Sequence, residues 1–224
     1  MRELDIRRSI IDHCRQMNAT GLNQGTAGNI SVRHGGRMLI TPSAVPYDEM
    51  EPEMIASFAI DGEGEAWEGP MNPSVEWRFH LDILRSRPET GAVVHTHSSF
   101  ATILAMARKP IPACHYMIAA FGGHDVKVCN YARYGTRALS VNVLKALEGR
   151  SACLMANHGM VVTGPNLPRA MWAAIELETI ARQYYHTLLI GGPVILPDDE
   201  IAGVLEGFGN YGRQDTERRS SPVG

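Results

Sequence analysis

The chain has 224 residues, of which 44% are hydrophobic, so it can bury one large core or two modest ones. Its 21 basic and 24 acidic residues give a net charge of -3 and are scattered without long runs, which argues against nucleic acid as a partner. No apolar stretch approaches the roughly 18 residues of a membrane span, and the charged N-terminus is unlike a signal peptide, so no membrane partner is expected.

The first predicted element is an amphipathic helix over residues 4–18, with apolar side chains at helical spacing, which ends at Gly21. The loop Gly25-Thr-Ala-Gly-Asn29 follows and leads into a short strand at 30–32. Glycines in such a loop let backbone N–H groups approach an anion, and the Thr26 and Asn29 side chains can add donors. A tight turn before a strand explains the same residues without any ligand, because the loop is neither a Walker loop nor a dinucleotide fingerprint.

Two hairpins are predicted next. The turn at 34–37 leads into a returning strand at 38–40, and the segments 58–60 and 65–67 flank a second turn. Consecutive hairpins indicate antiparallel pairing in the sheet rather than an array of βαβ units.

A helix is predicted to begin at Pro73, with Asn72 as its N-cap, and to end near Arg85. Glu76 then lies in the first turn, where a carboxylate complements the helix dipole. Glu76 and His80 are also four residues apart on one helix face, so the two could ligate a metal together. The spacing alone does not choose between these interpretations.

The segment Gly91-Ala-Val-Val-His-Thr-His97 is predicted to be a buried strand. Because side chains alternate along a strand, Val93, His95 and His97 share one face while Val94 and Thr96 take the other. Two imidazoles roughly 6–7 Å apart along a rigid strand can converge on one cation.

The second half of the chain repeats this arrangement once. An apolar strand at 152–156 runs into Asn157-His-Gly159, which places His158 at a strand end beside a glycine. The other elements expected here are helices at 100–107, 139–147, 171–189 and 198–208 and strands at 126–129 and 160–163. Residues 1–212 are expected to form a single domain, and the polar tail at 213–224 is expected to be disordered.

Three histidines at strand ends indicate a catalytic divalent metal site that keeps one position open. The four cysteines lie far apart and form no Cys-x-x-Cys pair, which argues against thiolate ligands. Widely spaced, unpaired cysteines also predict reduced thiols and a cytoplasmic location. An open metal site beside a loop rich in anion donors suggests a small, negatively charged substrate.

Seven segments, in order and with similar spacing, resemble the class II sugar-phosphate aldolases. They are Gly21-Leu-Asn-Gln-Gly-Thr-Ala-Gly-Asn-Ile-Ser-Val-Arg33, Leu39-Ile-Thr-Pro42, Glu76-Trp-Arg-Phe-His80, Ala92-Val-Val-His-Thr-His97, His115-Tyr-Met-Ile-Ala-Ala120, Tyr134-Gly-Thr-Arg137 and Asn157-His-Gly159. The resemblance implies an α/β fold of three layers, α/β/α, with a mainly antiparallel central sheet. It also implies a homotetramer whose active sites lie at subunit interfaces.

The resemblance further implies a zinc ion held by His95, His97, His158 and Glu76, although manganese or cobalt fits the same ligands. Glu76 would be a ligand at rest and the catalytic base once substrate binds. Such an ion would stabilise the negative charge of an enediolate formed from a dihydroxyacetone-phosphate unit. Tyr116 matches the tyrosine that protonates the leaving aldehyde oxygen across a subunit boundary, and Tyr211 matches a C-terminal tyrosine near the active site.

The residues that match the family's phosphate site are Thr26, Gly28, Asn29, Thr41, Ala44 and Ser74. Two departures from the family pattern stand out: Val75 replaces a second serine, and Ala44 replaces a glycine. A lost hydroxyl removes one hydrogen bond to phosphate, and a Cβ at Ala44 crowds the backbone. The phosphate could therefore sit differently, or a carboxylate could take its place.

The implied function is cleavage of a ketose 1-phosphate into dihydroxyacetone phosphate and an aldehyde. Within the family, a decarboxylase or a retro-aldol epimerase is the alternative. A non-catalytic protein akin to adducin heads would carry substituted ligands, whereas all four are present here.

Overall fold

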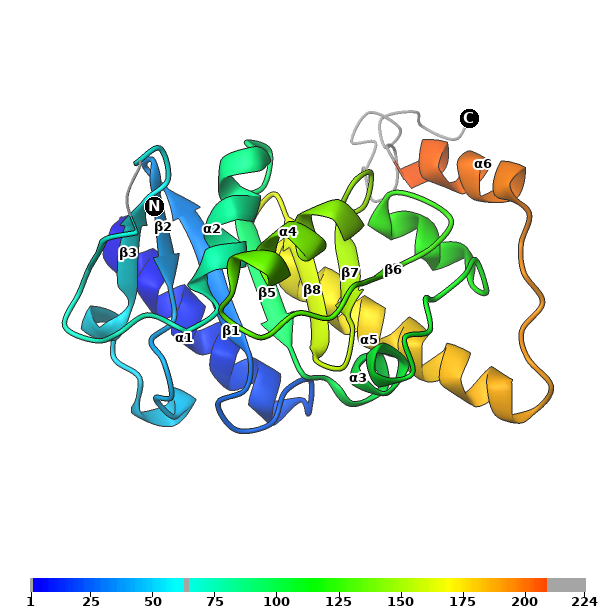
Figure 1. Ribbon diagram of the computed structural model, residues 1–224, viewed down its shortest axis with the longest axis horizontal. Coiled ribbons are helices and arrows are strands. Elements are labelled where there is room, and N and C mark those ends of the chain that lie inside the picture. Colours follow the sequence, from blue (N-terminus) through cyan, green and yellow to red (C-terminus); the bar gives the residue numbers. More distant parts are fainter. Residues whose placement is uncertain (1, 63–64, 209–224) are drawn as a thin grey trace, which may run out of the picture.

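The computed structural model describes residues 2–62 and 65–208 (Figure 1). Within these ranges the chain forms an eight-stranded sheet with the order β4-β3-β2-β1-β5-β8-β7-β6. The strands are β1 (Asn29–His34), β2 (Arg37–Ile40), β3 (Ala56–Ala59), β4 (Trp67–Glu68), β5 (Ala92–Thr96), β6 (Lys127–Cys129), β7 (Ala152–Met155) and β8 (Gly159–Gly164). Neighbouring strands are antiparallel except for β6 and β7, so the mainly antiparallel sheet expected from the hairpins is confirmed.

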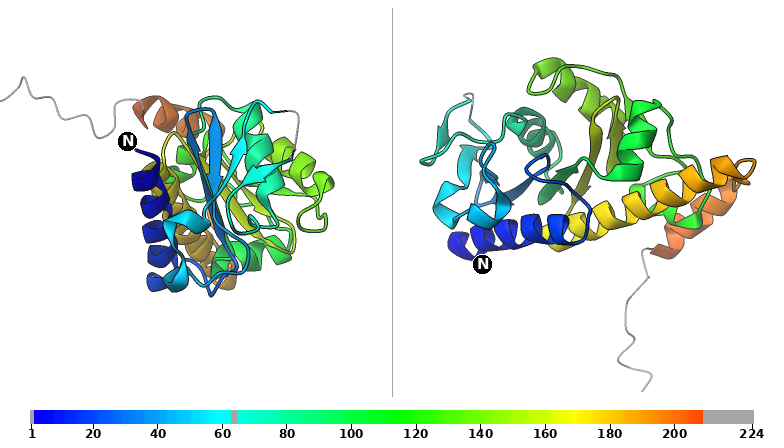
Figure 2. Two further views of the ribbon diagram at one scale, coloured as in Figure 1. Left: turned by 90° about the vertical axis from the view of Figure 1, so that its left-hand side faces the viewer. Right: turned by 90° about the horizontal axis from the view of Figure 1, so that it is seen from below.

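Helices cover both faces of this sheet and complete the three predicted layers. One face carries α1 (Glu3–Ala19), α3 (Ser99–Met106) and α5 (Leu167–Leu189), and the other carries α2 (Trp77–Ser86) and α4 (Arg137–Ala146). Figure 2 shows the sheet edge-on between these two groups of helices. Three short 3₁₀ helices complete the described chain, η1 (Tyr47–Glu49), η2 (Pro52–Met54) and η3 (Tyr116–Phe121), together with α6 (Asp198–Phe208), which packs on η3.

The strand β5 lies near the middle of the sheet, between β1 and β8, and every one of its residues is buried. Its side chains alternate as predicted. Val93 packs into the core beneath α2 and α4, whereas Ala92 and Val94 pack into the core beneath α1, α3 and α5. His95 follows Val93 toward the α2 side, where its ring meets the edge of Phe79 at a centroid distance of 5.7 Å.

The helix α2 begins four residues later than its sequence predicts, at Trp77 rather than at Pro73. The cause is a contact with a distant part of the chain. Pro73 forms an isolated β-bridge with Pro42, and the Ser74 N–H donates to the Thr41 carbonyl at 2.9 Å, so this segment stays extended. Glu76 therefore lies at the N-cap of α2, not within its first turn, and its side chain makes no capping hydrogen bond.

Other boundaries also differ from those predicted. The long helix α5 starts at Leu167 instead of residue 171, because the Asn166 side chain caps it by accepting from the Arg169 N–H. In the second hairpin, the strands lie at Ala56–Ala59 and Trp67–Glu68. The segment 115–123, which lacks a clear periodicity, contains the 3₁₀ helix η3.

Across the described parts of the chain, no helix is both long enough and apolar enough to span a bilayer. The predicted domain end at residue 212 and the tail that follows it lie outside the described residues, as does Tyr211.

Candidate metal centre and active site

Four side chains from separate parts of the sequence meet at one point beside the sheet. They are Glu76, His95, His97 and His158, and one ligand atom from each lies within 4.8 Å of all the others. The strand β5 supplies His95 and, one residue past its end, His97, while the turn between β7 and β8 supplies His158. Glu76 reaches the same point from the start of α2.

The three imidazoles are arranged with near threefold regularity. All three pairs of ring centroids are 4.9 Å apart, and the rings are inclined to one another by 73° to 78°. Their Nε2 atoms face inward: those of His95 and His97 are 3.0 Å apart. The Glu76 carboxylate lies over this group, with Oε2 at 3.1 Å from His95 Nε2 and Oε1 at 3.2 Å from His158 Nε2.

The protonation pattern of His95 leaves a lone pair at the centre of this group. Its Nδ1 lies 2.8 Å from the Met160 carbonyl oxygen, which can only accept, so Nδ1 carries the hydrogen and Nε2 is bare in the neutral ring. A second partner of this kind is typical of metal-bound histidines, because it fixes the tautomer and the ring orientation. Glu76 Oε1 is buried and has no hydrogen-bond donor in the structure. Inward-facing lone pairs and a buried carboxylate together fit a divalent cation.

Electrostatics keep Glu76 and His97 in the forms that bind metal. Burial alone would raise the pKa of the Glu76 carboxyl, but the adjacent His95 and His158 imidazoles outweigh burial and hold that pKa well below its usual range. Burial and the neighbouring His95 lower the pKa of His97 to about 4. At neutral pH, Glu76 is therefore a carboxylate and the His97 ring is neutral.

The backbone on either side of His158 is specialised for the close approach of β5. Asn157 adopts a left-handed conformation with φ of 53°, and Gly159 follows it. A Cβ on Gly159 would lie 2.5 Å from the Thr96 carbonyl oxygen and 2.9 Å from His97 Cδ2. Only glycine therefore lets β8, which begins directly after His158, pack this closely against the end of β5.

The segment after His97 is held in place by hydrogen bonds to a side chain of α5. Both carboxylate oxygens of Glu178, on α5, accept from the first free N–H groups of α3, at 2.8 Å from Phe100 N and 2.9 Å from Ala101 N. A carboxylate at a helix N-terminus is also favoured by the helix dipole. This contact fixes the start of α3 two residues beyond His97.

Part of the predicted phosphate site is adjacent to this centre. Asn29 is paired with His95 across β1 and β5, and its Nδ2 donates to Glu76 Oε2 at 3.0 Å. Gly28 packs so closely that a Cβ there would lie 2.6 Å from the His95 carbonyl oxygen. Ser74 Oγ accepts from the Glu76 N–H at 3.3 Å.

The remaining predicted phosphate residues are Thr41, Thr26 and Ala44. Thr41 is buried and bonds with the backbone of Ile30, whereas Thr26 and Ala44 are exposed. Ala44 has φ of 58°, a left-handed conformation that costs an L-residue roughly 1–2 kcal/mol. This explains why a glycine is expected at that position.

A cavity of about 310 Å³ opens beside the metal ligands. It is lined by Ala27, Val75, Glu76, His97, Tyr131, Ala132, Tyr134, Asn157 and His158. Val75, Tyr131 and Tyr134 each expose more than half of their surface, so they form an accessible, mainly apolar wall facing the centre. Sequence reasoning assigned no role to either tyrosine, although Tyr134 lies in one of the seven segments that carry the family resemblance.

Two other sequence-predicted residues lie apart from the four ligands. His80 is fully buried and hydrogen-bonds to Asn29 and Ser31, so it does not join Glu76 in the donor group. Tyr116 is half exposed at the start of η3, stacks on His115, and is not part of the cavity wall.

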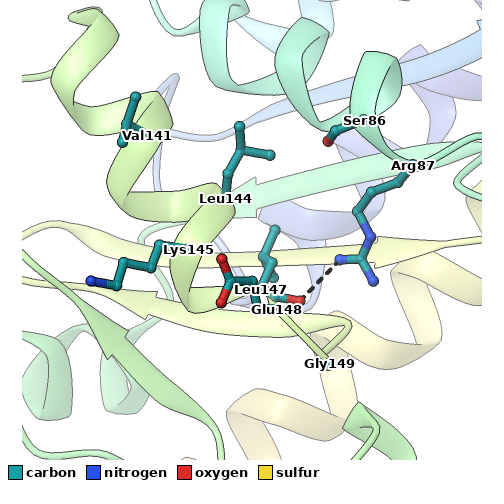
Figure 3. A pocket seen from close by; sticks show the side chains of 8 residues that line it. All are labelled: Ser86, Arg87, Val141, Leu144, Lys145, Leu147, Glu148 and Gly149. Carbon is teal, nitrogen blue, oxygen red and sulfur yellow. Dashed lines mark hydrogen bonds between the residues drawn. The ribbon is translucent and has the colours of Figure 1, made fainter.

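A second, larger cavity of about 560 Å³ lies between the end of α2 and α4, away from the metal centre (Figure 3). The Arg87 guanidinium at its edge donates to the carbonyl oxygens of Leu147 and Arg150. Its charged groups do not converge on a common point, and no metal-ligating cluster lies there among the described residues.

Comparison with known proteins places the chain in a family. Residues 8–185 match the Class II Aldolase and Adducin N-terminal domain. The 5-methylthioribulose-1-phosphate/5-deoxyribulose-1-phosphate aldolase of Rhodospirillum rubrum is 51% identical over 217 residues, which cover 97% of this chain and 96% of that protein. The L-fuculose phosphate aldolase of Escherichia coli (strain K12) is 48% identical, over 92% of this chain and 94% of that protein.

A solved structure of an L-fuculose 1-phosphate aldolase superposes with a TM-score of 0.87 at 40% identity, covering 92% of this chain and 96% of the other. The chain therefore belongs to the class II aldolase and adducin N-terminal domain family, as its sequence segments indicate. Within that family it is an aldolase, a lyase, like the enzymes to which it is similar.

The donor set makes a direct prediction about metal content. Three neutral imidazoles and a carboxylate predict about one divalent ion per chain in purified protein, measured by elemental analysis. His95→Ala or His158→Ala is expected to lose metal and activity together. His80→Ala is the control and is expected to retain the ion. Full activity after exhaustive chelation would contradict a role for metal.

Proposed function

We propose that this aldolase cleaves a ketose 1-phosphate into dihydroxyacetone phosphate and an aldehyde, using a divalent metal ion, preferably zinc. The observation that carries this proposal is the convergence of three imidazoles and Glu76 beside an accessible cavity. In this proposal His95, His97, His158 and Glu76 hold the ion, which supplies stabilisation of the negative charge that develops on the substrate oxygens. Manganese or cobalt would suit the same donors.

The catalytic base in this proposal is Glu76. Its carboxylate lies against two imidazoles, and its backbone is tied to the adjacent anion-binding segment by Ser74. Once substrate displaces it from the donor group, Glu76 can give a proton to the carbon of the dihydroxyacetone-phosphate half on cleavage, and take that proton back in the reverse condensation. Its burial excludes bulk water from the proton that it moves.

The phosphate group is assigned to the segment next to the base. Asn29 uses one N–H of its amide for Glu76 and has a second to offer, while Thr41, Ser74 and the backbone near Gly28 and Ala44 add further donors. Thr26 lies at the exposed rim of this group. The missing serine at Val75 leaves enough donors for a phosphate, held less tightly than two serines would hold it.

The aldehyde half of the substrate is assigned to the part of the cavity wall formed by Tyr131, Ala132 and Tyr134. This wall is mainly apolar, so it suits an aldehyde that ends in an apolar group. It therefore favours, as a second candidate substrate beside a fuculose-1-phosphate-like ketose, the 5-deoxy or 5-methylthio ribulose 1-phosphates for which relatives are named. A decarboxylase or epimerase would use the same metal and base.

A neighbouring copy of the chain is proposed to complete the site. Tyr116 is proposed to take the proton of the hydroxyl that becomes the aldehyde oxygen on cleavage, and to return it in the reverse condensation. It lies on the surface of its own chain, where a second copy can receive it. Exposed apolar side chains on α3 and after α5, among them Met106, Ile190 and Val194, favour a covered surface. A homotetramer with shared sites satisfies both observations. Tyr211 is proposed to join the same site, and the cytoplasmic location stays a prediction, which the four free cysteines support.

The function is tested by turnover of L-fuculose 1-phosphate and 5-deoxyribulose 1-phosphate, with and without chelator, in the wild type and in Glu76→Gln. The substitution keeps a metal-binding oxygen but removes the base, so metal is expected to remain while turnover falls by roughly 10²–10⁴-fold. If Glu76 only complemented the dipole of α2, the same change would lower stability by about 0.3–1 kcal/mol and leave turnover intact. A decarboxylase or epimerase would release no dihydroxyacetone phosphate from either sugar.

A second prediction concerns the anion pocket. Val75→Ser is expected to restore a hydroxyl and tighten the binding of dihydroxyacetone phosphate, because a charge-assisted hydrogen bond contributes roughly 1.5–3 kcal/mol. Isothermal titration of both proteins measures this difference. If Val75 instead marks a pocket shaped for a carboxylate or an uncharged end, kcat/KM will be higher for an unphosphorylated substrate than for its phosphate ester.

A third prediction concerns assembly. Sedimentation at the assay concentration is expected to give a tetramer, and Tyr116→Phe is expected to lower kcat without changing the sedimentation coefficient. Mixing Tyr116→Phe with Glu76→Gln chains and allowing exchange would restore part of the activity, because some interfaces then carry both native residues. A fully active monomer would rule out a shared site.

A further inference from the structure

A continuous chain of buried hydrogen bonds runs behind the metal centre and ends on the proposed base. Ser31 Oγ lies 2.7 Å from His80 Nδ1, and His80 Nε2 lies 2.5 Å from Asn29 Oδ1. Asn29 Nδ2 then donates to Glu76 Oε2 at 3.0 Å. Ser31 and His80 are fully buried, and Asn29 and Glu76 expose only 4% and 5% of their surface.

The direction of every hydrogen bond in this series, from donor to acceptor, follows from the Glu76 carboxylate at its end. A carboxylate can only accept, so the group of Asn29 that faces Glu76 must be its NH₂. The amide oxygen then faces His80 Nε2, which must carry the hydrogen. Burial lowers the pKa of His80 to about 3, so the ring is neutral and its Nδ1 is bare. That nitrogen accepts from the Ser31 hydroxyl, and all three bonds are satisfied in one orientation only.

The reverse orientation is excluded by its contacts. A His80 tautomer with the hydrogen on Nδ1 would leave Nε2 bare against the Asn29 amide oxygen, so two acceptors would face each other at 2.5 Å. Turning the amide over to avoid this would place its oxygen against the Glu76 carboxylate. Unpaired buried acceptors of this kind are strongly unfavourable.

These hydrogen bonds also join the proposed base, Glu76, to β1 and α2. Ser31 and Asn29 alternate along β1 and so share one face, and the ring of His80, on α2, bridges their side chains. Phe79 stacks on the same ring at a centroid distance of 4.5 Å. A base that is to leave the metal and stay aimed at a substrate carbon needs such a fixed partner, because outer groups orient the residues that they bond.

We propose that Ser31 and His80 are positioning residues that lock the Asn29 amide and, through it, hold Oε2 of Glu76 in the orientation needed for proton transfer. This role rests on the proposed function of Glu76. It differs from ligation, because His80 points its Nε2 at Asn29 and not at the inward-facing donors. It differs from simple core packing, because it depends on which ring nitrogen carries the hydrogen.

The test compares His80→Gln with His80→Asn. The glutamine amide can place an N–H close to the position of Nε2 and so keep the bond to Asn29, whereas asparagine is one methylene shorter and reaches only as far as Nδ1. We expect His80→Asn to lower kcat by about 10- to 100-fold with a smaller rise in KM, and His80→Gln to recover most of that loss. Both are expected to keep wild-type metal content at saturating metal.

A third variant covers the case in which His80→Asn does not fold. Ser31→Ala removes only the hydroxyl at the far end and is expected to give a smaller but measurable loss of kcat at unchanged metal content. Ser140→Ala is the matched control: Ser140 is equally buried and bonds to Asp82 at 2.6 Å, outside the chain of bonds to Glu76. Equal kcat in Ser31→Ala and Ser140→Ala overturns the proposal, as does a loss in either His80 variant that added metal restores.

A second measurement tests the tautomer of His80 directly and does not depend on catalytic activity. Histidine-selective ¹⁵N NMR of the metal-loaded wild type, with His80→Gln to assign the signal, reports which ring nitrogen carries the hydrogen. We expect Nε2–H with bare Nδ1, and an Nδ1–H signal overturns the proposal. If the wild type cleaves no ketose 1-phosphate, the proposed function fails, yet this measurement still decides whether the hydrogen-bond chain has the orientation inferred here.

Discussion

The active site depends on four donor atoms, from Glu76, His95, His97 and His158, that converge on one point. His95 has given its hydrogen to the Met160 carbonyl, and its free nitrogen meets His97 and the Glu76 carboxylate at close to 3 Å. Lone pairs and a carboxylate held this close, in a buried place, are unfavourable unless a cation lies among them. The fold therefore holds its functional groups in an arrangement that favours metal binding over the metal-free state.

The sheet makes this arrangement possible because it fixes backbone positions rather than relying on flexible side chains. The strand β5 is paired on both sides, with β1 supplying Asn29 opposite His95 and β8 following the turn that carries His158. Of the four ligands, Glu76 alone comes from outside the strands and their ends, at the N-cap of α2. Consequently the imidazoles are held by the strand ladders, whereas the carboxylate comes from the segment before α2 and is joined to the sheet through Thr41 and Asn29.

Much of this arrangement can be predicted from the sequence, because the order of apolar and polar residues within each segment determines which side chains share a face. The alternation in 91–97 predicts which residues share a face with His95, and the apolar strand before Asn157 predicts that His158 lies at a strand end. The late start of α2 is not predictable in this way, because Pro73 obeys the local preference for a helix start until Pro42, from another part of the chain, pairs with it. The same holds for His80, whose spacing from Glu76 suggests a ligand, whereas its partners come from β1. Tyr131 and Tyr134 lie in a loop without periodicity, so only tertiary structure places them at the cavity.

The bridge between Pro42 and Pro73 has a consequence for any attempt to alter what this enzyme accepts. It ties together two short stretches, 41–44 and 72–76, which carry Thr41, Ala44 and Ser74 of the proposed phosphate site together with the base. An insertion or an exchange in either stretch would therefore disturb both functions at once. Tyr131 and Tyr134 belong to a different loop, which lines the cavity beside this unit and packs against it where Gly135 meets the Val75 carbonyl. An exchange of the 131–134 loop between relatives therefore leaves the Pro42–Pro73 bridge intact, provided that the incoming loop keeps the glycine that packs against Val75.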